Sequence, residues 1–135
     1  MLRPQQTKFR KHKKIRIRRI EQRQTKLNFG DVGLKSLEGG QVTSRQIEAV
    51  RRVITRKLKR TGRLWIRIFP NIPVTKKPVE VRMGKGKGAV DRWVAVVKPG
   101  TVLYEIGNVK PTLAHQAFLA AAKKLPMKCS IIHRD

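Results

Sequence analysis

The stretch TSRQIEAVRRVITRKLKRTG, residues 43–62, decides how this chain folds. Thr43 stands at the position of an N-cap, and Gln46 has the offset that completes a capping box. Beyond them, apolar residues recur at the spacings of one helical face: Ile47, Val50, Ile54 and Leu58. Because Gly62 is a natural stop, the pattern predicts a helix that begins after Thr43 and ends before Gly62.

The opposite face of this predicted helix is cationic. It carries Arg45, Arg52, Arg56, Lys59 and Arg60. Only Glu48 lies near enough to offset them, so the like charges would repel one another in water. A charge run is usually a solvated face, but such faces normally mix both signs. Since Arg offers a planar fork and Lys a point charge to phosphate oxygens, we interpret the five residues as phosphate contacts.

Residues 64–78 follow the helix and are predicted to be extended. Residues 64–69 alternate as a strand does, with one side made of Leu64, Ile66 and Ile68 and the other of Trp65, Arg67 and Phe69. Pro70 should end this strand. Three prolines lie in residues 70–78, which we therefore expect to be an extended connection rather than a strand.

The next segment predicts short strands around tight turns. A strand at 79–82 and a second one at 93–97 flank a glycine-rich loop at 83–88. Pro99 and Gly100 then form a turn, after which a strand returns at 102–106.

The two ends of the folded part are predicted from the same signals. Pro111 suits the first position of a second helix that ends near Pro126, with a buried face made of Leu113, Ala117, Phe118 and Ala121. A final strand follows at 128–132. Upstream, residues 27–29 alternate as a strand, and Gly30, Gly33, Gly39 and Gly40 should break the chain into turns. The order of elements predicts an α+β fold, a mixed or antiparallel sheet sandwich with two helices.

Composition indicates a polyanionic partner. The chain has 135 residues, and its 33 Lys and Arg against 8 Asp and Glu give a net charge of +25. No apolar run is long enough to span a membrane. Cys129 is a single cysteine, and the three histidines have no ligand spacing, so we expect no disulfide, metal or other cofactor.

Much of the charge lies in residues 1–26, which we call the arm. The arm carries a net charge of +10. Its candidate RNA contacts are Lys8, Arg10, Lys11, Lys13, Lys14, Arg16, Arg18 and Arg19, interleaved with Ile15, Ile17 and Ile20. Such a segment can order on a polyanion by releasing counterions. A disordered solubilising tail and a membrane-surface helix are the alternatives. A presequence would be rich in serine, yet the first serine is Ser36, so we expect the arm to be retained.

The loop GKGKG at 84–88 does not have the spacing of a nucleotide site. A P-loop needs Ser or Thr after Gly-Lys, and a dinucleotide fingerprint needs a glycine that opens a helix. Three glycines and two lysines in this loop suit close approach of its backbone to RNA phosphates. The alternative interpretation is that the loop is merely a flexible hairpin tip. No catalytic constellation surrounds Ser44, His115 or the aspartates.

Four segments of the chain carry specific motifs: MLRP at 1–4 with TKFRK at 7–11, RQIEA at 45–49 with Arg51 and Arg52, WIRIFP at 65–70, and RMGKGKG at 82–88 with WVA at 93–95. Together they resemble the large-subunit ribosomal protein sixteen family of bacteria and organelles. The resemblance covers nearly the whole chain. It departs in the arm, where family members usually have basic residues in place of Gln5 and Gln6 and a glycine in place of part of Ile15–Ile20.

The resemblance implies an α+β protein that binds large-subunit rRNA near the peptidyl transferase centre and the central protuberance. It implies contact with A-site tRNA and, in second place, P-site tRNA, as well as neighbouring ribosomal proteins; RNA would carry out the peptide-bond chemistry. The tRNA-proximal loop would be Arg82, Met83, Gly84, Lys85, Gly86, Lys87 and Gly88. We expect residues 27–135 to form a single rRNA-binding domain, with no membrane and no small-molecule substrate.

Two other classes of function remain as alternatives. A DNA-compacting or membrane-surface protein would share the charge but not its uneven placement, and a nucleotide-dependent enzyme would need a different glycine spacing. For the compartment, the departures in the arm favour an organelle with its own genome, a mitochondrion or plastid, over a bacterial cytoplasm.

Overall fold

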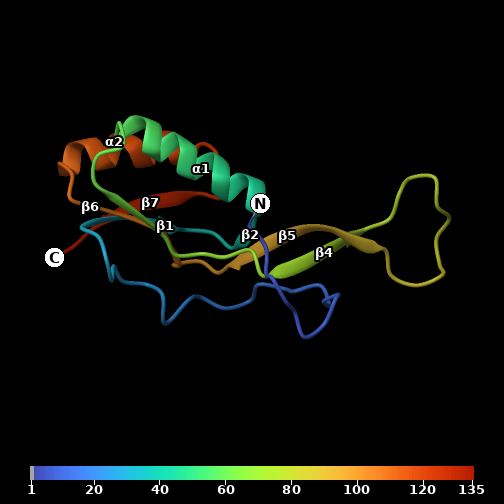
Figure 1. The fold of residues 1–135 in the computed structure, drawn as a ribbon. Coiled ribbons are helices and arrows are strands. Elements are labelled where there is room, and N and C mark those ends of the chain that lie inside the picture. The colour runs from blue at the N-terminus through green and yellow to red at the C-terminus, as the bar shows by residue number, and fades with distance from the viewer. Residues whose placement is uncertain (1) are drawn as a thin grey trace.

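The computed structural model describes residues 2–135 and consists of two antiparallel sheets and two helices (Figure 1). One sheet has the order β3-β6-β1-β7, and the other has the order β2-β5-β4. The helices are α1 (Ser44–Lys57) and α2 (Pro111–Ala122), which pack together on one face of the four-stranded sheet. The predicted α+β class is confirmed. Met1, where the family resemblance begins, lies outside the described residues.

Helix α1 begins as its sequence predicts. The Gln46 backbone N–H donates to Oγ1 of Thr43 at 3.2 Å, and the Thr43 N–H donates to Oε1 of Gln46 at 2.9 Å, so the capping box is confirmed. The helix ends at Lys57, and the next residues turn, with Lys59 and Arg60 in the left-handed region at φ 51° and 62°. The chain thus leaves the helix before Gly62, while Leu58 stays buried.

The core lies between the two helices and the four-stranded sheet. The predicted apolar face of α1 is confirmed, since Ile47, Val50 and Ile54 are fully buried. In α2, Ala117, Phe118 and Ala121 are buried as predicted, whereas Leu113 is half-buried and Ala114 takes the core position. The hydroxyl of Tyr104 on β6 (Val102–Gly107) donates to the carbonyl of Ile47 at 3.1 Å, which ties α1 to the sheet.

The glycine-rich segment is the first place where the predicted elements were wrong. Instead of turns, it forms β1 (Val32–Ser36), which is flanked by two partners in the sheet, and β2 (Gly40–Thr43). Residues 27–29, predicted as a strand, are irregular. The reason is that Gly33 leaves room on the sheet: a Cβ there would lie 2.2 Å from Cδ2 of Leu27, so Leu27 packs where a side chain would stand.

The second error concerns which strands pair. β4 (Ile72–Lys76) lies in the predicted connection and pairs with β5 (Ala89–Val97), whereas residues 79–82 form a turn and irregular backbone. Pro73 is tolerated because β4 is an edge strand. The turn at Pro99 and Gly100 carries the chain from one sheet to the other, so β5 and β6 are not paired with each other.

The remaining strands lie close to their predicted positions. β3 (Arg63–Ile66) is shorter than predicted, although the Arg67 N–H still donates to the Leu103 carbonyl at 2.9 Å. β7 (Cys129–His133) is the final strand. Neither helix among residues 2–135 has the length and apolarity needed to cross a membrane.

Candidate nucleic-acid interface

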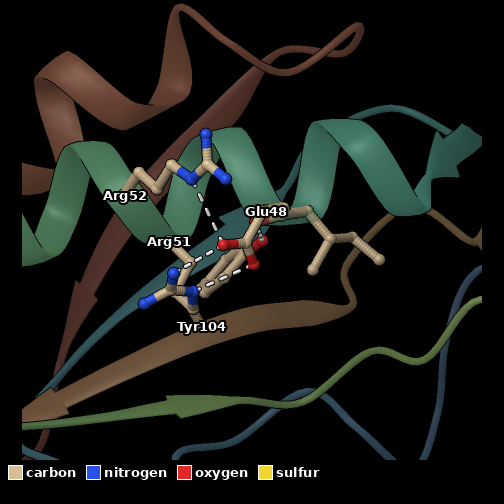
Figure 2. Close-up of polar contacts among 5 residues, drawn as sticks. Glu48, Arg51, Arg52 and Tyr104 are labelled. Carbon is tan, nitrogen blue, oxygen red and sulfur yellow. Dashed lines mark hydrogen bonds and ion pairs between the residues drawn. The ribbon is translucent and has the colours of Figure 1, made fainter. Parts of the chain in front are cut away.

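The outward face of α1 is organised around a single acid. Glu48 accepts from Arg51 through two atoms, at 2.9 Å to Nε and 2.5 Å to Nη2, and from Nε of Arg52 at 3.3 Å (Figure 2). The hydrogen bonds from Arg51 are the largest cause that lowers the pKa of Glu48, to about 2. Glu48 is therefore ionised at neutral pH, and it orients both guanidinium groups on this face.

The C-terminal half of α1 and the turn after it form a cationic hollow of about 580 Å³. Its lining is Arg51, Arg52, Thr55, Arg56, Lys59 and Arg60. Four of the five predicted helix contacts meet here, because the left-handed turn brings Lys59 and Arg60 beside the helix. Arg45 does not join them; it lines a separate hollow with Leu2, Glu48 and Arg52. No acidic residue lines the first hollow, and Glu48 beside it is a single negative charge against five cations, so the hollow carries a net positive charge.

The arm begins beside α1 and then crosses the base of the β4–β5 hairpin. Leu2 and Arg45 share one hollow, and Arg3 and Trp93 share another. Further along, His12 lies near the end of the Gly/Lys loop: Nζ of Lys87 donates to the His12 carbonyl, and Nζ of Lys11 donates to the Lys87 carbonyl at 3.1 Å. The arm and the loop, far apart in sequence, are therefore joined.

The second half of the arm runs along the face of the four-stranded sheet opposite the helices (Figure 1). The Glu21 N–H donates to the Pro99 carbonyl at 3.0 Å, and the Val102 N–H donates to the Gln24 carbonyl at 2.9 Å. Ile15 and Ile17 are half-buried, and Ile17 packs beside Gly39, where an added Cβ would lie 2.8 Å from it. The arm thus has an inner and an outer side.

The cations of the arm are open to solvent. Each of the eight candidate contacts is exposed: Lys8, Arg10, Lys11, Lys13, Lys14, Arg16, Arg18 and Arg19. Ile15 and Ile17 are half-buried against the body, whereas the basic residues between and beside them are exposed to solvent. Ile20 differs from the other two isoleucines, because it is 71% exposed. The molecule accordingly presents cations on two opposite faces, that of α1 and that of the arm.

The Gly/Lys loop lies at the far end of the β4–β5 hairpin, away from the helices and the four-stranded sheet (Figure 1). Residues 82–87 are exposed, and Gly88 is half-buried. Gly84, Lys85 and Gly86 occupy the left-handed region, at φ 101°, 59° and 87°, and no atom lies within 4 Å of a Cβ added at either glycine. Nζ of Lys77 donates to the Gly84 carbonyl at 2.5 Å, but no atom covers the position of a side chain on Gly84 or Gly86. That side of the loop backbone is therefore open to close approach.

An anchor that the sequence does not predict holds the end of the arm to the body. The buried carboxylate of Glu105 accepts from the backbone N–H groups of Asn28, Phe29 and Gly30, at 2.8, 2.7 and 3.0 Å. It also accepts from Nη1 of Arg67 at 3.0 Å. Burial raises the pKa of Glu105, but these hydrogen bonds outweigh it and the net direction is downward. In the sequence, this anchor is indicated only by Glu105 itself, a single acid within a predicted strand of otherwise apolar residues.

A second set that sequence reasoning missed is aromatic. The rings of Phe29 and Trp65 stack with centroids 5.9 Å apart, and the guanidinium of Arg63 lies 5.2 Å from the Trp65 ring centroid. Arg51 was likewise not among the predicted contacts, although it lines the cationic hollow. The alternation of residues 64–69 indicated only that Trp65 and Arg67 share a side.

Metal-ligating side chains do not gather anywhere in residues 2–135 in groups of three or more. Burial raises the pKa of the Cys129 thiol to about 11, so it is protonated at neutral pH.

Comparison with known proteins identifies the family. A profile of the ribosomal protein L16p/L10e family matches residues 4–132. The chain is 57% identical over 134 residues to the large ribosomal subunit protein uL16 of Azorhizobium caulinodans, covering 99% of this chain and 98% of that protein. It is 53% identical over 135 residues to the protein of the same name from Francisella tularensis subsp. novicida, covering 100% and 98%. The chain therefore belongs to the ribosomal protein L16p/L10e family and is a structural constituent of the large ribosomal subunit.

Proposed function

We propose that the chain docks on large-subunit rRNA through the cationic hollow of α1 and through the arm, near the peptidyl transferase centre and the central protuberance. The observation that carries this proposal is the hollow itself, in which four guanidinium groups and Lys59 converge without an acid in the lining. Phosphate is the ligand that such a set of forks and point charges fits. The role is architectural, and the chain is not an enzyme.

The two cationic faces support a position between rRNA segments. One face is the outer side of α1 and the other is the outer side of the arm, with the sheets between them (Figure 1). A body with cations on opposite sides neutralises phosphates of two RNA segments at once and thereby fixes their separation. We assign the arm, residues 1–26, to the part that completes its order on RNA, and residues 27–135 to the folded rRNA-binding domain.

Reversal of charge in the hollow tests the docking surface. The double variant Arg52→Glu, Arg56→Glu should incorporate poorly into large subunits when it competes with the wild-type chain during reconstitution. Lys123→Glu, Lys124→Glu is the matched control, because it makes the same change in net charge at exposed positions beyond α2. Equal incorporation of the first variant and the wild type would contradict docking through α1. An equal loss in both variants would favour the alternative of a general nucleic-acid-compacting protein.

Salt dependence gives a second measure of the same surface. Each phosphate contact releases a counterion, so affinity for rRNA falls as salt rises. Neutralising two contacts, as in Arg52→Gln with Arg56→Gln, should reduce the slope of log affinity against log salt by about 2. An unchanged slope would mean that these side chains do not touch phosphate.

For the Gly/Lys loop we propose a role in positioning A-site tRNA and, in second place, P-site tRNA. Its support is the exposed tip, where no atom lies within 4 Å of a Cβ added at Gly84 or Gly86. Deletion of residues 85–87 should spare assembly but slow tRNA accommodation in single-turnover kinetics. That deletion also removes the tie between Lys87 and His12, so Lys85→Gln is the narrower variant. A normal accommodation rate in both variants would contradict this role.

The setting that we propose is a bacterial ribosome. The relatives named above come from bacteria, and they do not favour the organelle that the departures in the arm had suggested. Growth of a bacterial strain whose own copy of the gene is replaced by this one would support the proposal. Failure to support growth, together with normal incorporation into subunits, would contradict it.

A further inference from the structure

We propose that Phe29, whose ring stacks on that of Trp65, is a receiving site for one unstacked RNA base. This inference rests on the proposed function, since it assumes that the chain contacts RNA, but it concerns a different surface from the α1 hollow. Phe29 is 57% exposed although its ring already stacks on Trp65, with centroids 5.9 Å apart and planes 18° from parallel. A half-covered ring in this geometry leaves room for another flat partner.

The ring is held in place before any ligand arrives. Its backbone N–H donates to the Glu105 carboxylate at 2.7 Å, and the N–H groups of Asn28 and Gly30 on either side donate to the same carboxylate. Gly30 lies so close to β6 that a Cβ there would stand 2.6 Å from the Ile106 carbonyl oxygen. An exposed aromatic side chain on a backbone fixed at three consecutive residues loses little entropy on binding.

The surroundings suit a base rather than an apolar protein segment. Trp65, on which the Phe29 ring stacks, is half-buried. Gly107 leaves room for the Trp65 indole, because a Cβ added at Gly107 would lie 3.0 Å from the indole ring. The exposed guanidinium of Arg63 lies 5.2 Å from the indole centroid, and Lys26 nearby in the chain is also exposed. Single-stranded RNA is bound by this combination, in which a ring takes the base and cations take the backbone.

Binding of a short RNA to the full-length chain tests the inference. The probe is a single-stranded RNA of about 12 nucleotides that carries one 2-aminopurine, whose fluorescence falls when it stacks. Phe29→Leu should weaken binding by about fivefold or more, which is the loss of one base stack. It should leave the salt slope unchanged, because no charge is removed. Phe29→Tyr should bind as the wild type does.

The matched control is Phe69→Leu, which removes another exposed aromatic ring outside the stack. Wild-type affinity in Phe29→Leu, or an equal loss in Phe69→Leu, would overturn the inference while a steep salt slope left the proposed function standing. If the wild-type chain bound neither this probe nor rRNA, the proposed function itself would fail.

A crosslink in assembled subunits provides a readout that does not depend on how the leucine variant folds. A photoreactive benzoyl-phenylalanine placed at position 29 should crosslink to rRNA, and the nucleotide can then be mapped. Crosslinking to a neighbouring protein alone would overturn the inference, because it would mean that Phe29 packs on a protein partner instead of a base.

Discussion

The Nη1 atom of Arg67 lies 3.0 Å from Oε1 of Glu105, in a pair whose side chains are 9% and 0% exposed. The same Nη1 donates to the carbonyl of Lys26 at 2.6 Å, at the last residue of the arm. Glu105 meanwhile holds three backbone N–H groups of the residues that follow. One buried ion pair thus fixes the point where the arm joins the sheet.

Glu105→Gln should destabilise the chain by about 3 kcal/mol, because it leaves Arg67 without its counter-ion in a buried site. The amide would also turn an N–H group toward one of the donors that the carboxylate accepts. The free energy of unfolding from urea titration measures the first effect. Faster hydrogen exchange at Asn28, Phe29 and Gly30 measures the release of the arm.

Glu38→Gln is the control for that substitution. Glu38 pairs with Lys128 at 3.9 Å on the surface, with 52% of its side chain exposed, so its loss should cost less than about 1 kcal/mol. Comparable losses in the two variants would mean that the Glu105 network does not stabilise the fold.

Acid should remove the contribution of Glu105. Burial raises the pKa of this group, but the N–H donors and Arg67 lower it by a larger amount. The net result is a pKa below the ordinary 4.5. A carboxyl with a depressed folded-state pKa stabilises the fold above the unfolded pKa, and this stabilisation is lost as pH falls through the folded pKa. The difference in unfolding free energy between wild type and Glu105→Gln should therefore be largest at neutral pH and shrink below about pH 4. A pH-independent difference would contradict the linkage.

The helices were predictable because their signals are local. The capping box of Thr43 and Gln46 and the apolar stripe from Ile47 depend on residues within a few turns of each other. Pro111 at the start of α2 is a signal of the same kind. No distant residue had to be known for either helix.

The strand pairing was not predictable, because distant residues decide it. Gly33 alone predicts a turn, and its place in a strand is explained only by Leu27, which packs where a Gly33 side chain would stand. Pro73 alone predicts a break in the strand, and it is tolerated only because β4 lies at the edge of its sheet. The cations of the site were visible in the sequence, but the convergence of Lys59 and Arg60 with Arg56 depends on a left-handed turn that no glycine marks. The Phe29–Trp65 stack joins residues that only the folded arm brings together.

Two glycines that look alike in sequence should respond differently to alanine. A Cβ on Gly30 would lie 2.6 Å from the Ile106 oxygen and 2.8 Å from its carbon, which are backbone atoms of β6 that cannot move aside. Gly30→Ala should therefore cost about 1–3 kcal/mol and free the segment at 27–30. At Gly86 the Cβ meets nothing within 4 Å, and the exposed loop can relax the strain that alanine has at a φ of 87°. Gly86→Ala should therefore cost less than about 1 kcal/mol and shift the unfolding midpoint less than Gly30→Ala does. Equal midpoints for the two variants in urea would contradict the close approach of Gly30.

Helix α2 lacks a side-chain cap, and supplying one should stabilise the protein. Lys110 is the N-cap with an extended backbone and no capping hydrogen bond, whereas Lys123 is the C-cap of the same helix. Lys110→Asp should add about 1 kcal/mol, because the carboxylate accepts from a free N–H of the first turn and faces the positive end of the helix dipole. Lys123→Asp makes the same change in net charge at the negative end, so it should destabilise by about 0.5 kcal/mol. Thermal unfolding of the two variants compares them directly, and equal shifts would mean that relief of net charge, rather than capping, is responsible.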